Sequence, residues 1–114
     1  MKRISTHVLD MNWGKPAQHL PVRLERQVKS GEWILITASH TDGDGRCAQL
    51  LPENTGLESG DYRLVFDISS YQSGNHIESL YPVIEITFRV REGESQFHLP
   101  LLLSPHGYTT YRGS

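Results

Sequence analysis

Histidine, arginine and serine are the side chains in this sequence that could move a proton or hold an anion. The six histidines are His7, His19, His40, His76, His98 and His106. A histidine has an unperturbed pKa near ~6.5, so it can accept or release a proton close to neutral pH. A lone histidine is more often a satisfied surface or core residue than a catalytic one. The residue type alone therefore selects none of the six.

The spacing of these residues argues against a metal site. Zinc needs three or four ligands, usually with one closely spaced pair. His98 and His106 are eight residues apart, and Cys47 is the single cysteine. Asp42 and Asp44 resemble the start of a calcium loop, but the later ligands of such a loop are missing. We expect no metal, and we expect residues 42–44 to form a turn.

Nucleophilic catalysis has no local signature either. The sequence contains no Gly-x-Ser-x-Gly elbow and no glycine-rich phosphate loop. Cys47 stands in no catalytic motif and is expected to face the core. Residue types and spacing thus predict polar groups at strand ends and leave the chemistry open.

The composition describes one small folded domain over residues 1–114. The formal charge is −2 and the pI is near 6.3, so the strongly basic footprint of a nucleic-acid-binding domain is absent. Hydrophobic residues make up 37% and charged residues 21% of the chain, which argues against disorder. No apolar run approaches the ~18 residues of a membrane span. We therefore expect neither nucleic acid nor a membrane as a partner.

The start of the chain predicts a cytoplasmic location. Residues 1–7 are charged, but Asp10 arrives before a signal peptide's apolar run of about 7–15 residues could form. A single cysteine also excludes the internal disulfides typical of small secreted domains. An exported mature form, numbered from a new Met1 after processing, is the alternative.

Most of the chain alternates apolar and polar residues with a period of two, which is typical of strands with one buried face. We expect seven or eight strands, at residues 5–9, 22–28, 33–38, 46–50, 62–68, 83–90, 97–103 and 108–111. Residues 69–80 contain few β-branched side chains and are expected to hold one short helix. The pattern predicts an all-β fold, a two-sheet antiparallel sandwich with that helix attached.

The run Leu99 to Leu103 (LPLLL) does not alternate. A strand that is apolar on both sides needs cover on both sides. In a small sandwich the outer face of each sheet is normally wet, so this run indicates either a partner subunit or a covering loop. We favour the partner subunit.

Three separated segments together resemble one family. They are residues 5–10 (STHVLD) with 14–17 (GKPA), residues 44–46 (DGR), and residues 97–105 (FHLPLLLSP) with 111–114 (YRGS). In this order they resemble the signatures of the transthyretin-like proteins, and in particular of the 5-hydroxyisourate hydrolase branch. The final YRGS is the specific part, because the carrier branch lacks it.

The resemblance implies a transthyretin-like sandwich that assembles as a homotetramer, a dimer of dimers with its active sites where dimers meet. It also implies hydrolysis of 5-hydroxyisourate to 2-oxo-4-hydroxy-4-carboxy-5-ureidoimidazoline in urate degradation. In that reaction, water opens a cyclic amide. Such a reaction needs a base and a group that stabilises an oxyanion, but neither a metal nor an organic cofactor.

The same resemblance implies a role for each matching residue. His7 and His98 are the candidates for general base and proton shuttle, in an order that the sequence leaves open. Arg46 would grip a carbonyl or anionic edge of the substrate with its planar guanidinium group. Ser114 would hydrogen-bond the water or the substrate, and its carboxylate would orient a neighbouring cationic group. Tyr111 would pack along the substrate ring.

Some positions depart from the family pattern, and another function remains open. Trp13, Cys47, His106 and Thr109 stand where the family usually has other residues, which bears on affinity or rim shape rather than on the reaction. The alternative function is that of a transthyretin-like carrier that holds a small aromatic ligand without converting it. A carrier that only binds an apolar ligand does not need the combination of His7, Arg46, His98 and the terminal YRGS.

Overall fold

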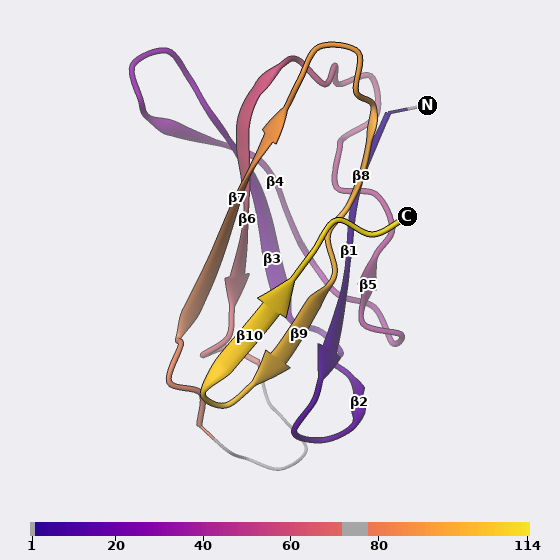
Figure 1. Ribbon diagram of the computed structural model, residues 1–114, viewed down its shortest axis with the longest axis vertical. Helices are drawn as coiled ribbons and strands as arrows, with labels where there is room; N and C mark the ends of the chain where they lie inside the picture. The colour runs from indigo at the N-terminus through magenta and orange to yellow at the C-terminus, as the bar shows by residue number, and fades with distance from the viewer. Residues whose placement is uncertain (1, 72–77) are drawn as a thin grey trace.

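The computed structural model describes residues 2–71 and 78–114, and these residues form two β-sheets without a helix (Figure 1). The strands are β1 (Arg3–Asp10), β2 (Lys15–Pro16), β3 (Pro21–Gln27), β4 (Trp33–His40), β5 (Arg46–Cys47), β6 (Gly60–Asp67), β7 (Val83–Val90), β8 (Gln96–His98), β9 (Leu101–Ser104) and β10 (Gly107–Thr110). Within this part of the chain, no helix is long and apolar enough to cross a lipid bilayer.

The second sheet is a regular antiparallel array, whereas the first is organised around β1. The second sheet has the strand order β4-β3-β6-β7. In the first sheet β1 pairs antiparallel with β2 and β5 on one side, and parallel with β8 and β9 on the other. β10 extends this sheet beyond β9. The two-sheet sandwich is confirmed, although β1 adds parallel pairing to an expected antiparallel fold.

The core lies between the two sheets and follows the period-two pattern of the sequence. Tyr62, Leu64 and Phe66 alternate along β6 and are at most 1% exposed. They belong to the same hydrophobic cluster as Ile4 and Val8 of β1, which are completely buried. Each such side chain contributes about 1.5–3 kcal/mol by leaving water. This burial fixes which face of β1 is inside, and so which face is left for chemistry.

The expected helix is not seen in the described residues. Residues 69–70 form a turn directly after β6, with the amide of Tyr71 donating to the carbonyl of Ile68 at 3.0 Å. Residues 78–80 have no regular structure. The remainder of the proposed helical stretch, residues 72–77, lies outside the described residues.

The apolar run at residues 99–103 is largely buried within its own chain. Leu99, Leu101 and Leu103 are at most 6% exposed and belong to the core, while Leu102 is half-buried on the other face. Pro100 is also buried, and its carbonyl accepts a hydrogen bond from the Thr110 hydroxyl at 2.8 Å. Cover by a partner subunit is therefore needed mainly at Leu102, and it stays a prediction.

Candidate active site

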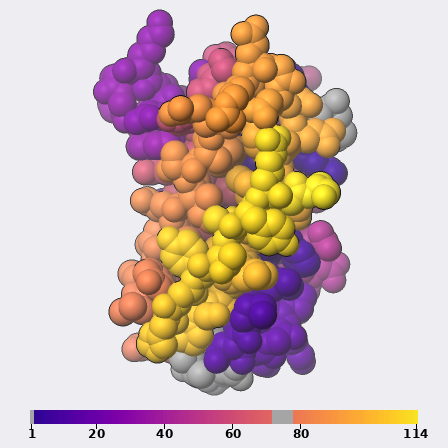
Figure 2. All heavy atoms as spheres, viewed as in Figure 1, coloured from indigo at the N-terminus to yellow at the C-terminus, as the bar shows by residue number. Residues whose placement is uncertain are grey.

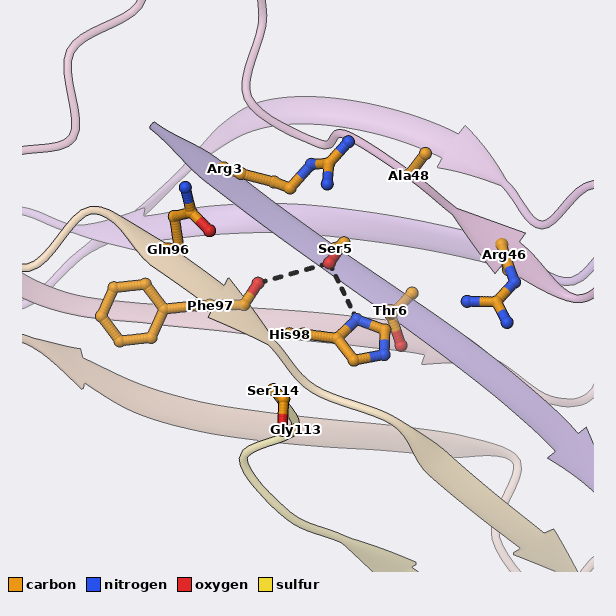
Figure 3. A pocket seen from close by; sticks show the side chains of 10 residues that line it. All are labelled: Arg3, Ser5, Thr6, Arg46, Ala48, Gln96, Phe97, His98, Gly113 and Ser114. Carbon is orange, nitrogen blue, oxygen red and sulfur yellow. Dashed lines mark hydrogen bonds between the residues drawn. The ribbon is translucent and has the colours of Figure 1, made fainter. Parts of the chain in front are cut away.

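A pocket of about 250 Å³ opens on the outer face of the first sheet (Figure 3). Its lining comes from β1, β5, β8 and the C-terminal segment, four parts of the chain that are far apart in sequence. The lining residues are Arg3, Ser5, Thr6, Arg46, Ala48, Gln96, Phe97, His98, Gly113 and Ser114. Figure 2 shows the C-terminal residues, in yellow, running across the face of the molecule that is turned to the viewer.

The register of β1 brings the predicted residues together. Side chains two apart on a strand share a face, so Ser5 and His7 both point away from the core. Ser5 lies opposite His98 in the parallel pairing with β8, and His7 lies opposite Arg46 in the antiparallel pairing with β5. Three of the four predicted catalytic residues, Arg46, His98 and Ser114, line the pocket. His7 is outside that lining, next to Arg46 at its edge.

The loop before β5 holds Arg46 in place. The Asp42 carboxylate accepts hydrogen bonds from the amides of Asp44 at 2.8 Å and Arg46 at 3.0 Å, and these bonds lower the pKa of Asp42. Gly45 has a φ of +77°, and a Cβ there would lie 2.5 Å from the carbonyl oxygen of Val8. Only glycine fits this close approach to β1. The predicted turn is therefore confirmed, and its purpose is to deliver the next residue beside His7.

His7 is oriented by the same loop. Its Nε2 lies 2.9 Å from the carbonyl oxygen of Asp44. A carbonyl can only accept a hydrogen bond, so Nε2 carries the proton. In neutral His7 the lone pair is therefore on Nδ1, which is the nitrogen free to take part in proton transfer.

His98 is held from two sides. Its Nδ1 lies 2.8 Å from the hydroxyl oxygen of Ser5, which is only 7% exposed. Figure 3 shows the ring between Ser5 and the residues Gly113 and Ser114, with its second nitrogen directed away from Ser5. Burial lowers the pKa of His98, and the positive charge of Arg46 lowers it further. His98 is therefore neutral at pH 7 and can accept a proton.

The C-terminal segment packs directly against His98. The amide of Gly113 donates to the carbonyl of His98 at 2.7 Å, and a Cβ on Gly113 would lie 2.7 Å from Cδ2 of the imidazole ring. Arg112 anchors the segment, because its guanidinium group donates to Glu94 at 3.1 Å and lies 4.4 Å from the centroid of the Phe97 ring. These contacts bring Ser114 into the pocket lining.

Tyr111 is placed differently from the other predicted residues. Its side chain is 53% exposed, and it is not part of the pocket lining. A contact between Tyr111 and a ligand within this chain alone is therefore not seen, and its role stays a prediction.

The residues to which no catalytic role was assigned largely have the burial that the sequence predicts. His19 and His40 are exposed, and His76 lies outside the described residues. Cys47 is 6% exposed, and burial raises the pKa of its thiol to about 11, so it stays protonated. Within the described ranges, 2–71 and 78–114, no group of three or more His, Cys, Asp or Glu side chains could hold a metal ion.

Sequence reasoning missed two residues that shape the pocket, Arg3 and Ser5. Both belong to the same face of β1 as His7, at spacings of four and two. That alternation was the available signal. What these residues face is set by the partner strand β8, which lies more than 90 residues away in sequence.

The chain matches the family model described as HIUase/Transthyretin family over residues 4–113. The chain belongs to this family. A 5-hydroxyisourate hydrolase from Mus musculus is 44% identical over 112 residues, which cover 97% of this chain and 94% of that protein. The structure of Klebsiella pneumoniae 5-hydroxyisourate hydrolase is 35% identical with a TM-score of 0.82 and covers 100% of both chains.

The resemblance seen in the sequence is thereby confirmed, but the fold alone does not separate the two branches of the family. Sea bream transthyretin, solved in complex with thyroxine, has a TM-score of 0.87 at 29% identity and covers 97% of this chain and 94% of its own. A transthyretin with bound thyroxine thus superposes at least as well as a 5-hydroxyisourate hydrolase does. Function on a shared fold must be argued from the site.

Proposed function

We propose that this protein is a 5-hydroxyisourate hydrolase that produces 2-oxo-4-hydroxy-4-carboxy-5-ureidoimidazoline in urate degradation. The observation that carries this proposal is the register of β1, which sets His7 against Arg46 and Ser5 against His98 around one pocket. Sequence similarity to proteins named as this hydrolase, up to 44% identity across nearly the whole chain, supports the same assignment.

The reaction adds water across one amide bond of the substrate ring. A base removes a proton from water as its oxygen attacks the carbonyl carbon, and the carbonyl oxygen becomes an oxyanion. The C–N bond then breaks, the nitrogen takes up a proton, and the former carbonyl becomes a carboxylate. The pocket must therefore supply a base, a proton donor and positive charge at the oxyanion.

His98 is the better placed of the two histidines to act as the base. Its pKa is lowered by burial and by Arg46, so it is neutral at pH 7. The Ser5 hydroxyl donates to the carbonyl of Phe97 at 3.5 Å and therefore accepts from Nδ1–H of His98 at 2.8 Å, so the lone pair of neutral His98 is on Nε2 and faces the water. His7, whose Nε2 is engaged by the Asp44 carbonyl, would pass a proton through Nδ1 instead.

Arg46 would stabilise the oxyanion or the anionic edge of the ring. In the described part of the chain its guanidinium group has no carboxylate partner within ion-pair distance, so its charge is available to a ligand. Ser114 would hydrogen-bond the water or the substrate from the opposite wall. Tyr111 would pack on the ring, a role that needs movement of its side chain or a second subunit.

A carrier function fits this face less well. The pocket lining includes two arginines, and an apolar aromatic ligand would leave these two cations desolvated without compensation. A carrier would also be insensitive to the loss of His98. The hydrolase is therefore the function that the described residues support best.

The proposal includes a homotetramer built as a dimer of dimers. Within the described residues β7 pairs only with β6 and β10 pairs only with β9, so each sheet has an edge open to another strand. Val83 and Tyr108 on these strands are 47% and 42% exposed. Light scattering at micromolar concentration tests the assembly, and a monomeric mass would contradict it. The cytoplasmic location stays a prediction that cell fractionation would test.

The test of the activity uses substrate made in place. Urate and urate oxidase generate 5-hydroxyisourate, and its decay is followed by ultraviolet absorbance with and without the protein. We expect decay to accelerate in proportion to protein concentration and to be unaffected by EDTA. The variant His98→Asn, checked for an unchanged melting temperature, is the control. Equal decay with native protein and with this variant would contradict the proposal.

A further inference from the structure

Arg3 brings to the pocket a positive charge that no motif of the sequence analysis identified. It is the first residue of β1 and lines the pocket together with Ser5 and Arg46. Its backbone amide donates to the carbonyl of Ser95 at 2.8 Å, which ties this end of β1 to the segment before β8. The base of the side chain is therefore fixed, while the guanidinium group is exposed at the pocket.

The charge of Arg3 is not neutralised by the protein. The carboxylate of Glu94, the residue before Ser95, is engaged by Arg112 at 3.1 Å. In residues 2–71 and 78–114, no carboxylate side chain lies within ion-pair distance of either Arg3 or Arg46. The lining contains no aspartate or glutamate, and the terminal carboxylate of Ser114, which does line it, forms no ion pair with either arginine in the described residues. Two guanidinium groups without an ion-pair partner around one pocket create a positive potential that an anionic ligand would relieve.

The two arginines approach the pocket from opposite ends. Arg46 lies opposite His7, whereas Arg3 lies four residues earlier on β1, opposite Gln96. At ~3.3 Å per residue this separates the two attachment points by about 13 Å along the strand. Figure 3 shows the two side chains on either side of Ser5 and Thr6. A ligand seated over His98 would thus have one guanidinium group at each end.

We propose that Arg3 is a second anion-binding residue of this pocket, which holds the acidic edge of a planar heterocyclic anion that lies away from Arg46. The inference rests on the proposed function and extends it. It assigns Arg46 to the reacting carbonyl and Arg3 to the far edge of the ring. Arg3 then sets affinity for the substrate rather than the rate of the chemical step, because its contact is equally strong before and during reaction.

The test compares Arg3→Gln with Lys2→Gln. Lys2 is the neighbouring residue, is exposed and does not line the pocket, so its replacement removes the same charge without touching the site. We expect Arg3→Gln to raise KM for 5-hydroxyisourate about tenfold with kcat changed less than about twofold. Lys2→Gln is expected to leave both constants within about twofold of the native values.

A binding measurement makes the test independent of catalysis. Urate, a purine anion that is not hydrolysed at this step, is titrated into each protein by calorimetry. Its Kd is expected to rise about tenfold in Arg3→Gln, and less so in Arg3→Lys, which keeps the charge. The rise should shrink at high salt, because exposed charges are screened.

The outcomes separate this inference from the proposed function. Native hydrolysis with equal KM and equal urate affinity in Arg3→Gln and Lys2→Gln would overturn the role of Arg3 and leave the function standing. A loss confined to kcat would also overturn it, because Arg3 would then act on the transition state. Urate binding that depends on Arg3, without any hydrolysis, would support the inference and overturn the function. A protein with neither binding nor hydrolysis would overturn both.

Discussion

The outer faces of the two sheets both carry arginines, but these arginines are in opposite electrostatic situations. On the second sheet, Glu25 accepts from Arg63 at 2.6 Å and from Arg23 at 3.3 Å, and its side chain is only 12% exposed. Although burial raises the pKa of Glu25, the hydrogen bonds from these arginines outweigh it and lower the pKa overall. On the first sheet, neither Arg3 nor Arg46 has such a partner in the described residues.

This difference distinguishes arginines that stabilise the fold through ion pairs from arginines whose charge can bind a ligand. An arginine that is ion-paired within the fold adds little to the binding affinity of a ligand, since its charge is already compensated. An arginine left uncompensated beside histidines costs some stability and offers its charge to a ligand. The first sheet accordingly places arginines without an ion-pair partner beside the predicted catalytic histidines, whereas Glu25 on the outer face of the second sheet binds two arginines.

The largest expected effect is that of His98→Asn on the first sheet. The variant keeps a polar side chain but removes the base, so kcat is expected to fall about 10²–10⁴-fold. His40→Asn, at an exposed histidine of the second sheet, is the matched control and should retain full activity. Both are measured by the ultraviolet assay on proteins with equal melting temperatures. Near-normal turnover in His98→Asn would remove this residue from the mechanism.

Deletion of residues 111–114 is the next largest change. It removes Ser114 from the pocket and Gly113 from the edge of His98, so most of the hydrolysis should be lost. The melting temperature should change only modestly, because Tyr111 and Arg112 are exposed. Activity and thermal unfolding are measured on the same sample. A truncated protein that hydrolyses substrate at a near-native rate would show that the segment has no catalytic role.

Gly113→Ala is expected to have an intermediate effect. The new Cβ would meet Cδ2 of His98 at 2.7 Å, so the ring or the segment must move. Relieving this overlap shifts the imidazole ring of His98 from its position, and a shift of about 1 Å in a catalytic group costs about 10–100-fold in kcat/KM. Gly107→Ala is the control, because a Cβ there meets nothing within 4 Å. Equal activity in the two variants would mean that the packing of Gly113 against His98 is unimportant.

The smallest expected effect is a shift in the pH profile. His98 must be neutral to act as a base, and burial together with Arg46, His7 and Arg3 lowers its pKa. Activity should therefore persist below the usual histidine pKa of ~6.5 and fall only at lower pH. Arg3→Gln removes one of these charges and should move the fall in kcat/KM to higher pH. A profile that is flat down to pH 5 in both proteins would contradict a histidine base.

The same pKa shift affects stability. Because the folded protein binds a proton at His98 less readily than the unfolded chain does, acid favours unfolding through this group. Stability from His98 is complete above the unfolded pKa and is lost as the pH falls toward the folded pKa. His98→Asn should remove this contribution to the acid dependence of unfolding.

Much of this fold follows from local pattern, whereas the site does not. The alternation of Tyr62, Leu64 and Phe66 was enough to predict β6 and its buried face. The contact between Ser5 and His98 depends on pairing between strands that are 93 residues apart, which no local pattern encodes. The roles of His7, Arg46 and His98 came from the family resemblance, because their types and spacing alone left the chemistry open.

The one expectation that the described residues do not bear out, the short helix, has a physical cause as well. The helix was inferred from a shortage of β-branched residues, but a shortage of strand formers is equally compatible with a turn. The subunit contact proposed at residues 99–103 stays a prediction, and the sequence does not show that the Thr110 hydroxyl donates to the carbonyl of Pro100 within this run.

The most direct test of the account compares one arginine from each sheet face. Arg46→Gln removes a guanidinium group that lines the pocket and has no ion-pair partner in the described residues. Arg23→Gln removes one that is ion-paired with Glu25 on the second sheet. The value of kcat/KM for 5-hydroxyisourate is measured for both at a temperature where both are folded. We predict a loss of at least about 100-fold in Arg46→Gln and a change of less than about twofold in Arg23→Gln. Equal losses in the two variants, or full activity in Arg46→Gln, would contradict the account.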